Sequence, residues 1–315
     1  MFDLIISGYS SFDHMLKLRS EVEVGRTALI ANATCTKIYW GGCSVNVAIA
    51  LQRLGMSTLP ILRVGSDYEL SGFASFLHKE GISTKAVSQC PDEICAQSFL
   101  LQMPSGEHIT TFYPGAMDER YAEPVSDDCF SGSRAGLMTV ASLRDNRYFL
   151  EGIQKAGIPL FFGMKGDPNA FPKDFLQEVL LSCEGIFMNE TEREQILALF
   201  GESSFNFLFD RGQAAFIAVT QGAEGLCLYE KNKREPARYP AVKPQRVEDT
   251  TGAGDAFLSG FLYGYLNGKA YSVCAKYGAV LAACVLEETG CCTGLPVKEQ
   301  FETRVEGSKE CQHFI

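Results

Sequence analysis

The stretch Asp249-Thr-Thr-Gly-Ala-Gly-Asp-Ala-Phe257 leads into an apolar segment that ends at Leu266. The small residues favour a tight turn that opens a helix, whose first backbone N–H groups lack intrahelical partners. Such a positive helix end can bind a phosphate or a developing negative charge. Asp255 follows at once, and its carboxylate would accept a proton from a hydroxyl held beside the anion. The stretch predicts transfer of a phosphoryl group to an alcohol.

We expect Gly252, Ala253, Gly254 and Asp255 to form the anion-binding turn, with Asp255 as the general base. Two glycines around an alanine would by themselves indicate only a bend, but the acid and the helix start beside them favour a functional site. Other phosphate motifs are absent from the sequence. The fragment Gly268-Lys-Ala fails the P-loop pattern at its last position, and no Gly-x-Gly-x-x-Gly follows a predicted strand.

The composition is that of a globular enzyme with one large α/β domain. The chain has 315 residues, of which 46% are hydrophobic and 21% charged. A formal net charge of −10 without a run of Lys or Arg argues against nucleic acid or an anionic membrane surface as a partner. The short apolar start fits no signal peptide, and no segment reaches the ~20 apolar residues of a membrane span. We therefore expect a cytoplasmic protein.

The twelve cysteines are scattered and form no Cys-x-x-Cys pair. This distribution favours reduced thiols used as small core residues over a metal site or a disulfide framework. A redox role for the neighbouring pair Cys291-Cys292 is not favoured.

The order of the predicted elements indicates a doubly wound, mostly parallel sheet with helices on both faces. A first strand covers Phe2–Ser7, a second Leu59–Val64, and a helix lies between them, after Gly41-Gly42. Further strands are expected near 136–141, 158–163, 184–188, 215–219 and 225–229. Helices are expected near 71–80, 173–182, 191–200, 255–267 and 270–286.

Two β-rich insertions, residues 14–39 and 93–118, interrupt this alternation. The second contains a hairpin, with strands 97–103 and 108–113 around the turn Pro104-Ser-Gly-Glu107, and residues 22–39 have β-forming composition. We expect the insertions to form a small separate sheet that covers the site as a lid. The catalytic core then consists of residues 1–13, 40–92 and 119–315.

The stretch from Asp249 to Phe257 resembles the second signature of the PfkB (ribokinase-like) family of carbohydrate and nucleoside kinases. Gly41-Gly-Cys-Ser-Val-Asn-Val-Ala48 resembles the first signature, and the likeness covers nearly the whole chain. The resemblance implies a three-layer α/β/α core with a β-sheet lid. It also implies transfer of the ATP γ-phosphate, with Mg²⁺, to a primary hydroxyl of a sugar or nucleoside.

The resemblance implies that Asp13, Gly41, Gly42 and Asn46 bind the hydroxyl groups of the substrate. From the residues alone, Asp13 is as consistent with a turn residue, and Asn46 with an exposed polar residue on a helix.

Three further groups of residues match family motifs. Asn189 and Glu192 resemble the Asn-x-x-Glu that organises Mg²⁺ through water, although from the residues alone a helix cap with a solvated acid is the favoured interpretation. The turn with Thr220, Gly222 and Gly225 resembles the one against the nucleotide, which Gly254 also touches. Asp249 and Thr251 resemble the K⁺ loop of potassium-activated members, together with three backbone carbonyls. These carbonyls belong to Leu286, Gly290 and Gly294.

One segment departs from the family pattern. Gly163-Met-Lys165 is inserted before Gly166-Asp-Pro168, so the position of Asp167 does not follow from the resemblance. Lys165 is either a phosphate contact or a solvated lysine of a loop.

The acceptor depends on the lid, which is rich in apolar and aromatic residues (Ile38, Tyr39, Trp40, Phe99, Leu101, Phe112 and Tyr113). About half of them must hold the lid or an interface together, because neighbouring residues of a strand face opposite sides. The rest favour a nucleoside acceptor slightly. A simple sugar kinase and a catalytically silent sensor remain alternatives, whereas an oxidoreductase lacks its fingerprint. The apolar lid also predicts a homodimer.

Overall fold

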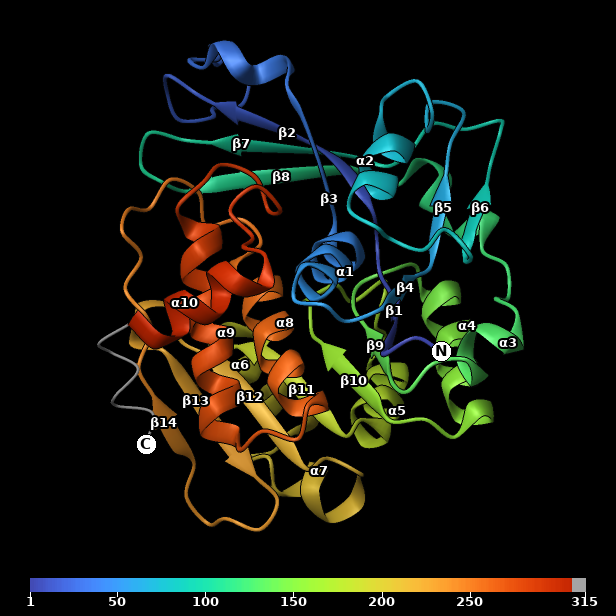
Figure 1. Cartoon of the computed structure of the whole chain (residues 1–315). Coiled ribbons are helices and arrows are strands. Elements are labelled where there is room, and N and C mark those ends of the chain that lie inside the picture. The colour runs from blue at the N-terminus through green and yellow to red at the C-terminus, as the bar shows by residue number, and fades with distance from the viewer. Residues whose placement is uncertain (308–315) are drawn as a thin grey trace.

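An eight-stranded sheet forms the centre of this computed structural model, which describes residues 1–307 (Figure 1). The strand order is β14-β13-β12-β11-β10-β9-β1-β4, and β13 alone runs opposite to the other strands, since it pairs antiparallel with both β12 and β14. Their bounds are β1 Leu4–Ser7, β4 Thr58–Pro60, β9 Gly136–Met138, β10 Leu160–Gly163, β11 Gly185–Asn189, β12 Phe216–Thr220, β13 Leu226–Glu230 and β14 Ala237–Tyr239.

Helices cover both faces of this sheet, because successive residues of each buried strand point to opposite sides. Ile6 and Phe161 belong to one hydrophobic cluster, whereas Ile5 and Phe162 belong to the other. The first cluster contains α1 (Cys43–Arg53), α2 (Phe73–Lys79), α8 (Ala253–Leu266), α9 (Tyr271–Leu286) and Phe301 of α10 (Lys298–Gly307). The second contains α3 (Asp127–Ser131), α4 (Leu143–Ala156), α5 (Lys173–Ser182), α6 (Glu190–Phe200) and α7 (Asn206–Arg211). The predicted three-layer fold is confirmed.

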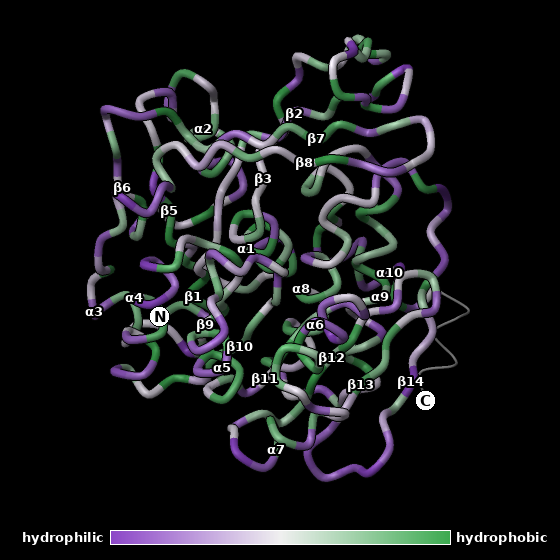
Figure 2. Tube along the Cα trace, turned by 180° about the vertical axis from the view of Figure 1, so that it is seen from behind, coloured by the Kyte–Doolittle hydropathy of each residue, from purple (hydrophilic) through white to green (hydrophobic). Residues whose placement is uncertain are grey.

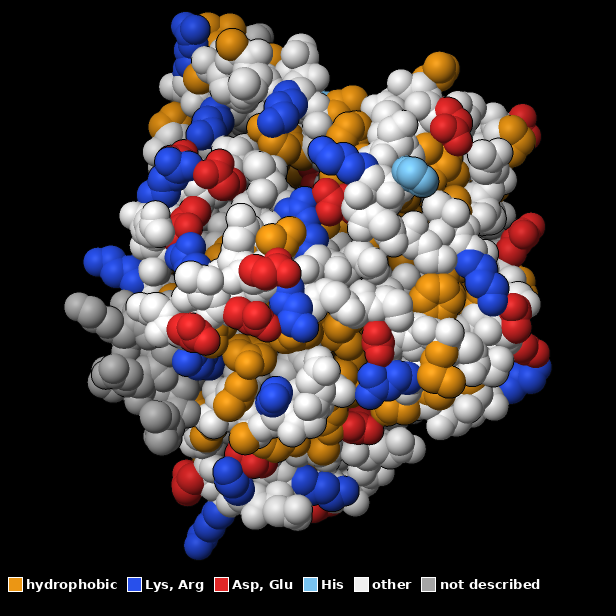
Figure 3. Space-filling model, viewed as in Figure 1, with side chains coloured by type: hydrophobic (Ala, Val, Ile, Leu, Met, Phe, Trp, Pro, Cys, Tyr) orange, Lys and Arg blue, Asp and Glu red, His pale blue; other side chains and the backbone are white. Residues whose placement is uncertain are grey.

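The central strands are mostly hydrophobic, and hydrophilic stretches lie toward the outside (Figure 2). On the face seen in Figure 3, acidic and basic side chains are interspersed rather than gathered by sign. Within residues 1–307 no helix has the length and apolar character needed to cross a bilayer.

A separate four-stranded sheet, hereafter the lid sheet, lies at the top of Figure 1. Its order is β3-β2-β7-β8, with bounds β2 Ser11–Lys17, β3 Ile38–Gly41, β7 Gln97–Gln102 and β8 His108–Tyr113. The predicted hairpin is therefore present. The β structure expected over 22–39 is wrong up to residue 37, because this mostly exposed segment makes one isolated bridge and a short 3₁₀ turn, Ala33–Thr36.

The single strand expected over Leu59–Val64 is also wrong, because the chain changes sheets after Pro60. Ile61 N–H donates to the Ile6 carbonyl (2.9 Å) at the edge of the main sheet. Leu62 N–H donates to the Ala86 carbonyl (3.1 Å), and β5 (Leu62–Val64) pairs with β6 (Val87–Gln89). A run of six mostly apolar residues does not reveal which neighbour each of them pairs with.

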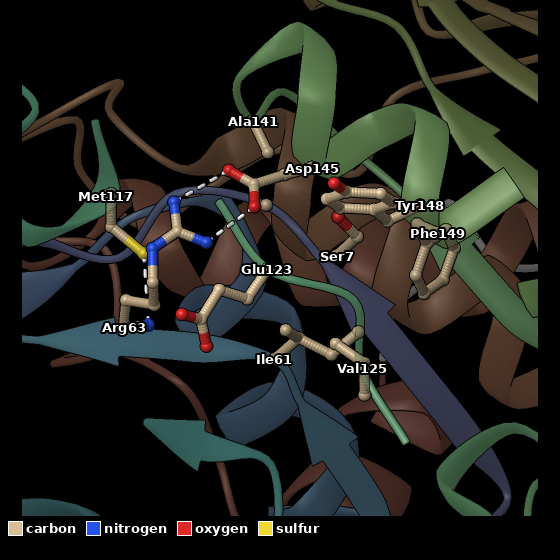
Figure 4. A pocket seen from close by; sticks show the side chains of 11 residues that line it. Ser7, Ile61, Arg63, Met117, Glu123, Val125, Ala141, Asp145, Tyr148 and Phe149 are labelled. Carbon is tan, nitrogen blue, oxygen red and sulfur yellow. Dashed lines mark hydrogen bonds and ion pairs between the residues drawn. The ribbon is translucent and has the colours of Figure 1, made fainter. Parts of the chain in front are cut away.

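Arg63 of β5 fastens the segment that leaves the lid sheet to the core (Figure 4). Its guanidinium forms two bonds to the Asp145 carboxylate of α4, at 2.5 and 2.8 Å, and its Nε donates to the Ala116 carbonyl at 2.9 Å. The Arg63 and Asp145 side chains are only 9% and 12% exposed. A buried charge whose partner is removed is costly, so this pair holds the exit from β8 in place.

We predict that Arg63→Met or Asp145→Asn lowers the free energy of unfolding by about 3–5 kcal/mol, because each leaves one buried charge unpaired. Urea denaturation measures this loss. Replacing both residues together by Met and Leu should restore part of the stability. The exposed ion pair of Lys85 and Asp128 is the control, and Lys85→Met should leave the denaturation midpoint nearly unchanged. An equal loss of stability on breaking the Arg63–Asp145 pair and the Lys85–Asp128 pair would contradict the role given to Arg63.

Candidate active site

The start of α8 presents free backbone N–H groups to a pocket. Gly252 caps the helix with φ +81°, and a Cβ there would lie 2.8 Å from the Cβ of Cys291. Both the left-handed backbone and the close approach of Cys291 therefore require glycine. A Cβ at Gly254 would meet no atom within 4 Å, so the turn is open on that side. Asp255 lies in the first turn of the helix and is 8% exposed.

The two glycine-rich segments of the sequence meet at Asp255. The Asn46 amide of α1 donates to Asp255 Oδ2 at 2.8 Å, and the thiol of Cys292 lies 3.4 Å from Asn46 Oδ1. Asn46 is 6% exposed, so it is not the solvated polar residue that its place on a helix also allows. The Lys165 ammonium approaches the other Asp255 oxygen, Oδ1, at 3.8 Å.

Asp13 lies on the same side of this cluster, in β2 of the lid sheet. It is 6% exposed, and the hydroxyl of Ser11 donates to its Oδ1 at 2.6 Å. A Cβ at Gly41 would lie 2.6 Å from Asp13 Oδ2 and 3.1 Å from Asn46 Oδ1, so glycine keeps this corner open. Gly42 has φ +89°, and a Cβ there would strike the Tyr9 carbonyl oxygen at 2.3 Å.

Burial raises the pKa of Asp13 from its ordinary value of 3.8 to about 7. The Ser11 hydroxyl lowers the pKa, whereas the negative charges of Asp255 and Asp249 raise it further. Between pH 3.8 and about pH 7, Asp13 is protonated in the folded protein and ionised in the unfolded chain. The contribution of Asp13 to the free energy of unfolding is therefore highest at low pH and falls as the pH rises to 7.

We predict that Asp13→Asn is more stable than the wild type at alkaline pH, because the amide carries no charge to desolvate. Its advantage should grow by about 2–3 kcal/mol between pH 5 and pH 8.5 and level off above pH 7. Denaturation curves recorded at several pH values measure this. Asp210→Asn, at an exposed aspartate of α7, should show no such trend. Parallel pH curves for wild type and Asp13→Asn would contradict the prediction.

The pocket at the start of α8 extends to the ends of β11 and β12. Its lining includes Lys165, Asn189, Glu192, Thr220 and Gly254, together with Asp255. Asn189 and Glu192 form a capping box at the start of α6, in which each side chain accepts the other's backbone N–H at 2.8 Å. Burial raises the pKa of Glu192, and the charge of Lys165 lowers it.

The remaining candidate residues lie in turns at the same edge of the main sheet. Gly222 is in the short 3₁₀ turn after β12, and Gly225 has φ +98° where a Cβ would lie 2.1 Å from the Tyr239 carbonyl oxygen. Asp249 accepts the backbone N–H and hydroxyl of Thr251 (2.9 and 2.7 Å) through Oδ1 and the Gly290 N–H (3.0 Å) through Oδ2. Asp249 therefore joins the α8 turn to the loop after α9.

The strand register sorts the lid residues between two faces. Tyr39 pairs with Asp13, Asp13 with Ser98 and Ser98 with Phe112, so these four share the face toward the core. The Phe112 ring packs against Tyr9 with centroids 4.8 Å apart. Tyr9 is a site residue that the sequence motifs did not single out, although it lies inside the segment from Gly8 to Asp13.

Cys291 and Cys292 are buried free thiols that pack beside Gly252 and Asn46. Burial raises the pKa of both thiols, so each is held as the neutral thiol. No cysteine of residues 1–307 is in a disulfide, and Cys311 lies outside the described residues.

The sequence model of the pfkB family carbohydrate kinases matches residues 10–298. The chain belongs to this family. It is 27% identical over 301 residues to the nucleoside kinase of Methanocaldococcus jannaschii, with 95% of each chain covered. It is 25% identical over 313 residues to the ribokinase of Haemophilus influenzae, covering 94% of this chain and 96% of that one.

Solved structures agree with the fold of this pfkB kinase. The crystal structure of the M. jannaschii nucleoside kinase, described as an archaeal member of the ribokinase family, has a TM-score of 0.86 at 25% identity, covering 97% and 98% of the two chains. The nucleoside kinase of Burkholderia thailandensis, in complex with inosine, has a TM-score of 0.85 at 22% identity with the same coverage. This pfkB kinase is thus a phosphotransferase that acts on a hydroxyl group, within the sugar and nucleoside kinases of the ribokinase family.

Proposed function

We propose that this pfkB kinase transfers the γ-phosphate of ATP to a primary hydroxyl, with Asp255 as the general base. The position of Asp255 carries the proposal, because its carboxylate lies between two sites. On one side it contacts Asn46, next to Asp13 and Gly41. On the other side it lines the pocket of Lys165, Asn189 and Glu192. A hydroxyl held by the first group would meet a phosphate held by the second.

The reaction needs one proton transfer and one displacement at phosphorus. Asp13, Gly41, Gly42 and Asn46 would hold the acceptor so that its hydroxyl oxygen faces the γ-phosphorus. Asp255 takes the hydroxyl proton as the new P–O bond forms and the bond to the ADP oxygen breaks. The backbone N–H groups of residues 252–255 would stabilise the charge on the transferred group.

The residues at the start of α6 fit a magnesium ion held through water. Asn189 and Glu192 retain oxygen lone pairs beyond the capping box, and Mg²⁺ in nucleotide sites keeps several waters and few protein carboxylates. No three acidic, His or Cys side chains within residues 1–307 form a direct metal site. When bound with ATP, the ion would neutralise phosphate charge.

The potassium role depends in part on a backbone carbonyl that has other partners. The Leu286 carbonyl accepts the backbone N–H of Glu248 at 2.8 Å and of Asp249 at 3.4 Å, so a K⁺ ion would share this oxygen with the Glu248 hydrogen bond. Asp249 and Thr251 remain the proposed K⁺ residues.

The acceptor that the lid face supports best is a nucleoside. Phe112 faces the core, is 40% exposed, and together with Tyr9 and Tyr39 gives the acceptor site an aromatic wall. Aromatic rings stack on flat nucleobases over the whole base, whereas a free sugar offers them only a smaller face of C–H groups. A simple sugar acceptor of the ribokinase or fructokinase type is the alternative. The intact Asp255 and glycine turn speak against a silent sensor.

We predict that the wild type releases ADP from ATP and Mg²⁺ with at least one member of a panel of nucleosides, ribose and fructose, tested with and without K⁺. Asp255→Asn should lower turnover by about 10²–10⁴-fold, because it removes the base. The variant should still bind ADP and remain folded, since the new amide oxygen can accept the Asn46 hydrogen bond. Near wild-type turnover of Asp255→Asn would refute its assignment as the general base. A wild type that binds these ligands without turning them over would favour a catalytically silent protein.

We also propose a cytoplasmic homodimer formed through the outer face of the lid sheet. Phe99, Ile109 and Tyr113 share that face and are 37–42% exposed. Exposed apolar residues on a sheet face are typical of an interface.

Light scattering should give a dimeric mass, and Phe99→Glu should shift it toward the monomer because the charge would be buried in the interface. Leu199→Glu, at an exposed leucine of α6 away from the lid, is the control and should leave the mass unchanged. A monomeric wild type would exclude this interface.

A further inference from the structure

Lys165 lies in the candidate site but has no part in the reaction described above. It follows β10 at the edge of the main sheet, two residues after Gly163. The backbone is fixed on both sides of it, because Met164 N–H donates to the Phe187 carbonyl and Asp167 N–H donates to the Lys165 carbonyl, each at 2.8 Å. The side chain therefore projects from a defined point rather than from a loose loop.

One carboxylate lies beside the Lys165 ammonium, and a second, that of Glu192, lines the same pocket. Its Nζ is 3.8 Å from Asp255 Oδ1, an ion-pair distance that is too long for a hydrogen bond. The charge of Asp255 is the main cause of a raised Lys165 pKa, and Glu192 adds to it, so the side chain is cationic at neutral pH. Among the described residues we find no hydrogen-bond acceptor for the ammonium, which leaves its donors for a ligand.

The pocket offers a phosphate no other positive side chain. Lys165 is the single basic residue among the described side chains that line it, and the turn of α8 supplies only neutral N–H groups. The pocket also contains the carboxylates of Asp255 and Glu192, and the whole chain has a net charge of −10. A γ-phosphate would meet repulsion here without a compensating cation.

We propose that Lys165 is a catalytic residue that binds the γ-phosphoryl group and bridges it to the Asp255 carboxylate. This inference rests on the proposed kinase function and concerns the same site. As the acceptor oxygen bonds to phosphorus, Asp255 takes its proton, and the electron pair of the breaking P–O bond leaves with ADP. Lys165 keeps its three protons and stabilises the charge on the transferred oxygens.

The alternative, a solvated lysine of a loop, fits the observations less well. The Lys165 side chain is 44% exposed, but its ammonium lies 3.8 Å from the carboxylate of Asp255, which is itself buried. A bridging role also gives a reason for the unusual Gly163-Met-Lys165 insertion. Gly163 lets β10 approach α8, because a Cβ there would lie 2.8 Å from Leu258 Cδ1, and this brings the next residues toward Asp255.

Nucleotide binding tests the proposal independently of turnover. We would measure by calorimetry, with Mg²⁺, the affinities of ADP and of the non-hydrolysable β,γ-imido analogue of ATP. Lys165→Met should weaken the binding of the analogue about tenfold or more, while the affinity for ADP should change by less than about threefold. Only the analogue carries the γ-phosphate. Lys165→Arg should keep most of the difference. Lys231→Met, at an exposed lysine beyond β13, is the control and should bind both ligands like the wild type.

Steady-state kinetics with an accepted substrate gives the second measurement. Lys165→Met should lower kcat by about 10²–10³-fold with little change in the acceptor KM, and Lys165→Arg should recover part of it. The proposal would be overturned by an unchanged ratio of analogue affinity to ADP affinity, whether or not both affinities fall, or by an unchanged kcat. A wild type inactive on every acceptor would refute the proposed function, while the calorimetric ratio would still decide whether Lys165 binds a γ-phosphate.

Discussion

The hydrogen bond between Asn46 and Asp255 is the interaction on which the site depends. It joins α1 to α8, two helices that are 209 residues apart at this bond and that cover the same face of the main sheet. Because both side chains are almost fully buried, the bond fixes the Asp255 carboxylate relative to the acceptor corner at Gly41. The glycines on either side make this approach possible, since a Cβ at Gly41 would occupy the space beside Asn46 and Asp13.

Buried acid groups give the site its chemical character. Asp13, Glu192 and Asp255 are all less than a tenth exposed, and the negative charge of Asp255 raises the pKa of each of the other two. Such an arrangement costs stability in the absence of ligands, because like charges in a poorly solvated site repel one another. It suits a site that receives cations and hydroxyl donors. Lys165 is the one basic side chain described in the nucleotide-side pocket, which makes its 3.8 Å approach to Asp255 informative.

The sequence predicted the layers of the fold and the start of α8 because both depend on local patterns. Apolar periodicity predicts the alternation of buried strands and helices, and the glycine turn before Asp255 is a contiguous motif. Strand partners depend on distant residues, so the change of sheet at Pro60 was missed. Helix α4 was also missed, although Ser142 caps it by accepting the Asp145 N–H and Gly157 ends it with φ +64°. Tyr9 was not singled out, and the sequence left Lys165 between a phosphate contact and a solvated lysine, because only the folded chain shows what each of them contacts.

On the proposed assignment, the α8 turn and Asp255 set the reaction at this site, whereas side chains of the lid face set the acceptor. The proposed phosphate binding at α8 would use N–H groups that any sequence with the same glycine turn presents, so the motif predicts the chemistry. The choice of acceptor follows from no comparable motif, because beyond Gly41 and Gly42 it depends on the side chains that the register of β2 and β8 turns toward the core. Phe112 illustrates the difference. A shift of one residue in the β7–β8 register would turn its ring outward and Tyr113 inward, leaving the kinase chemistry intact and altering what the enzyme can phosphorylate.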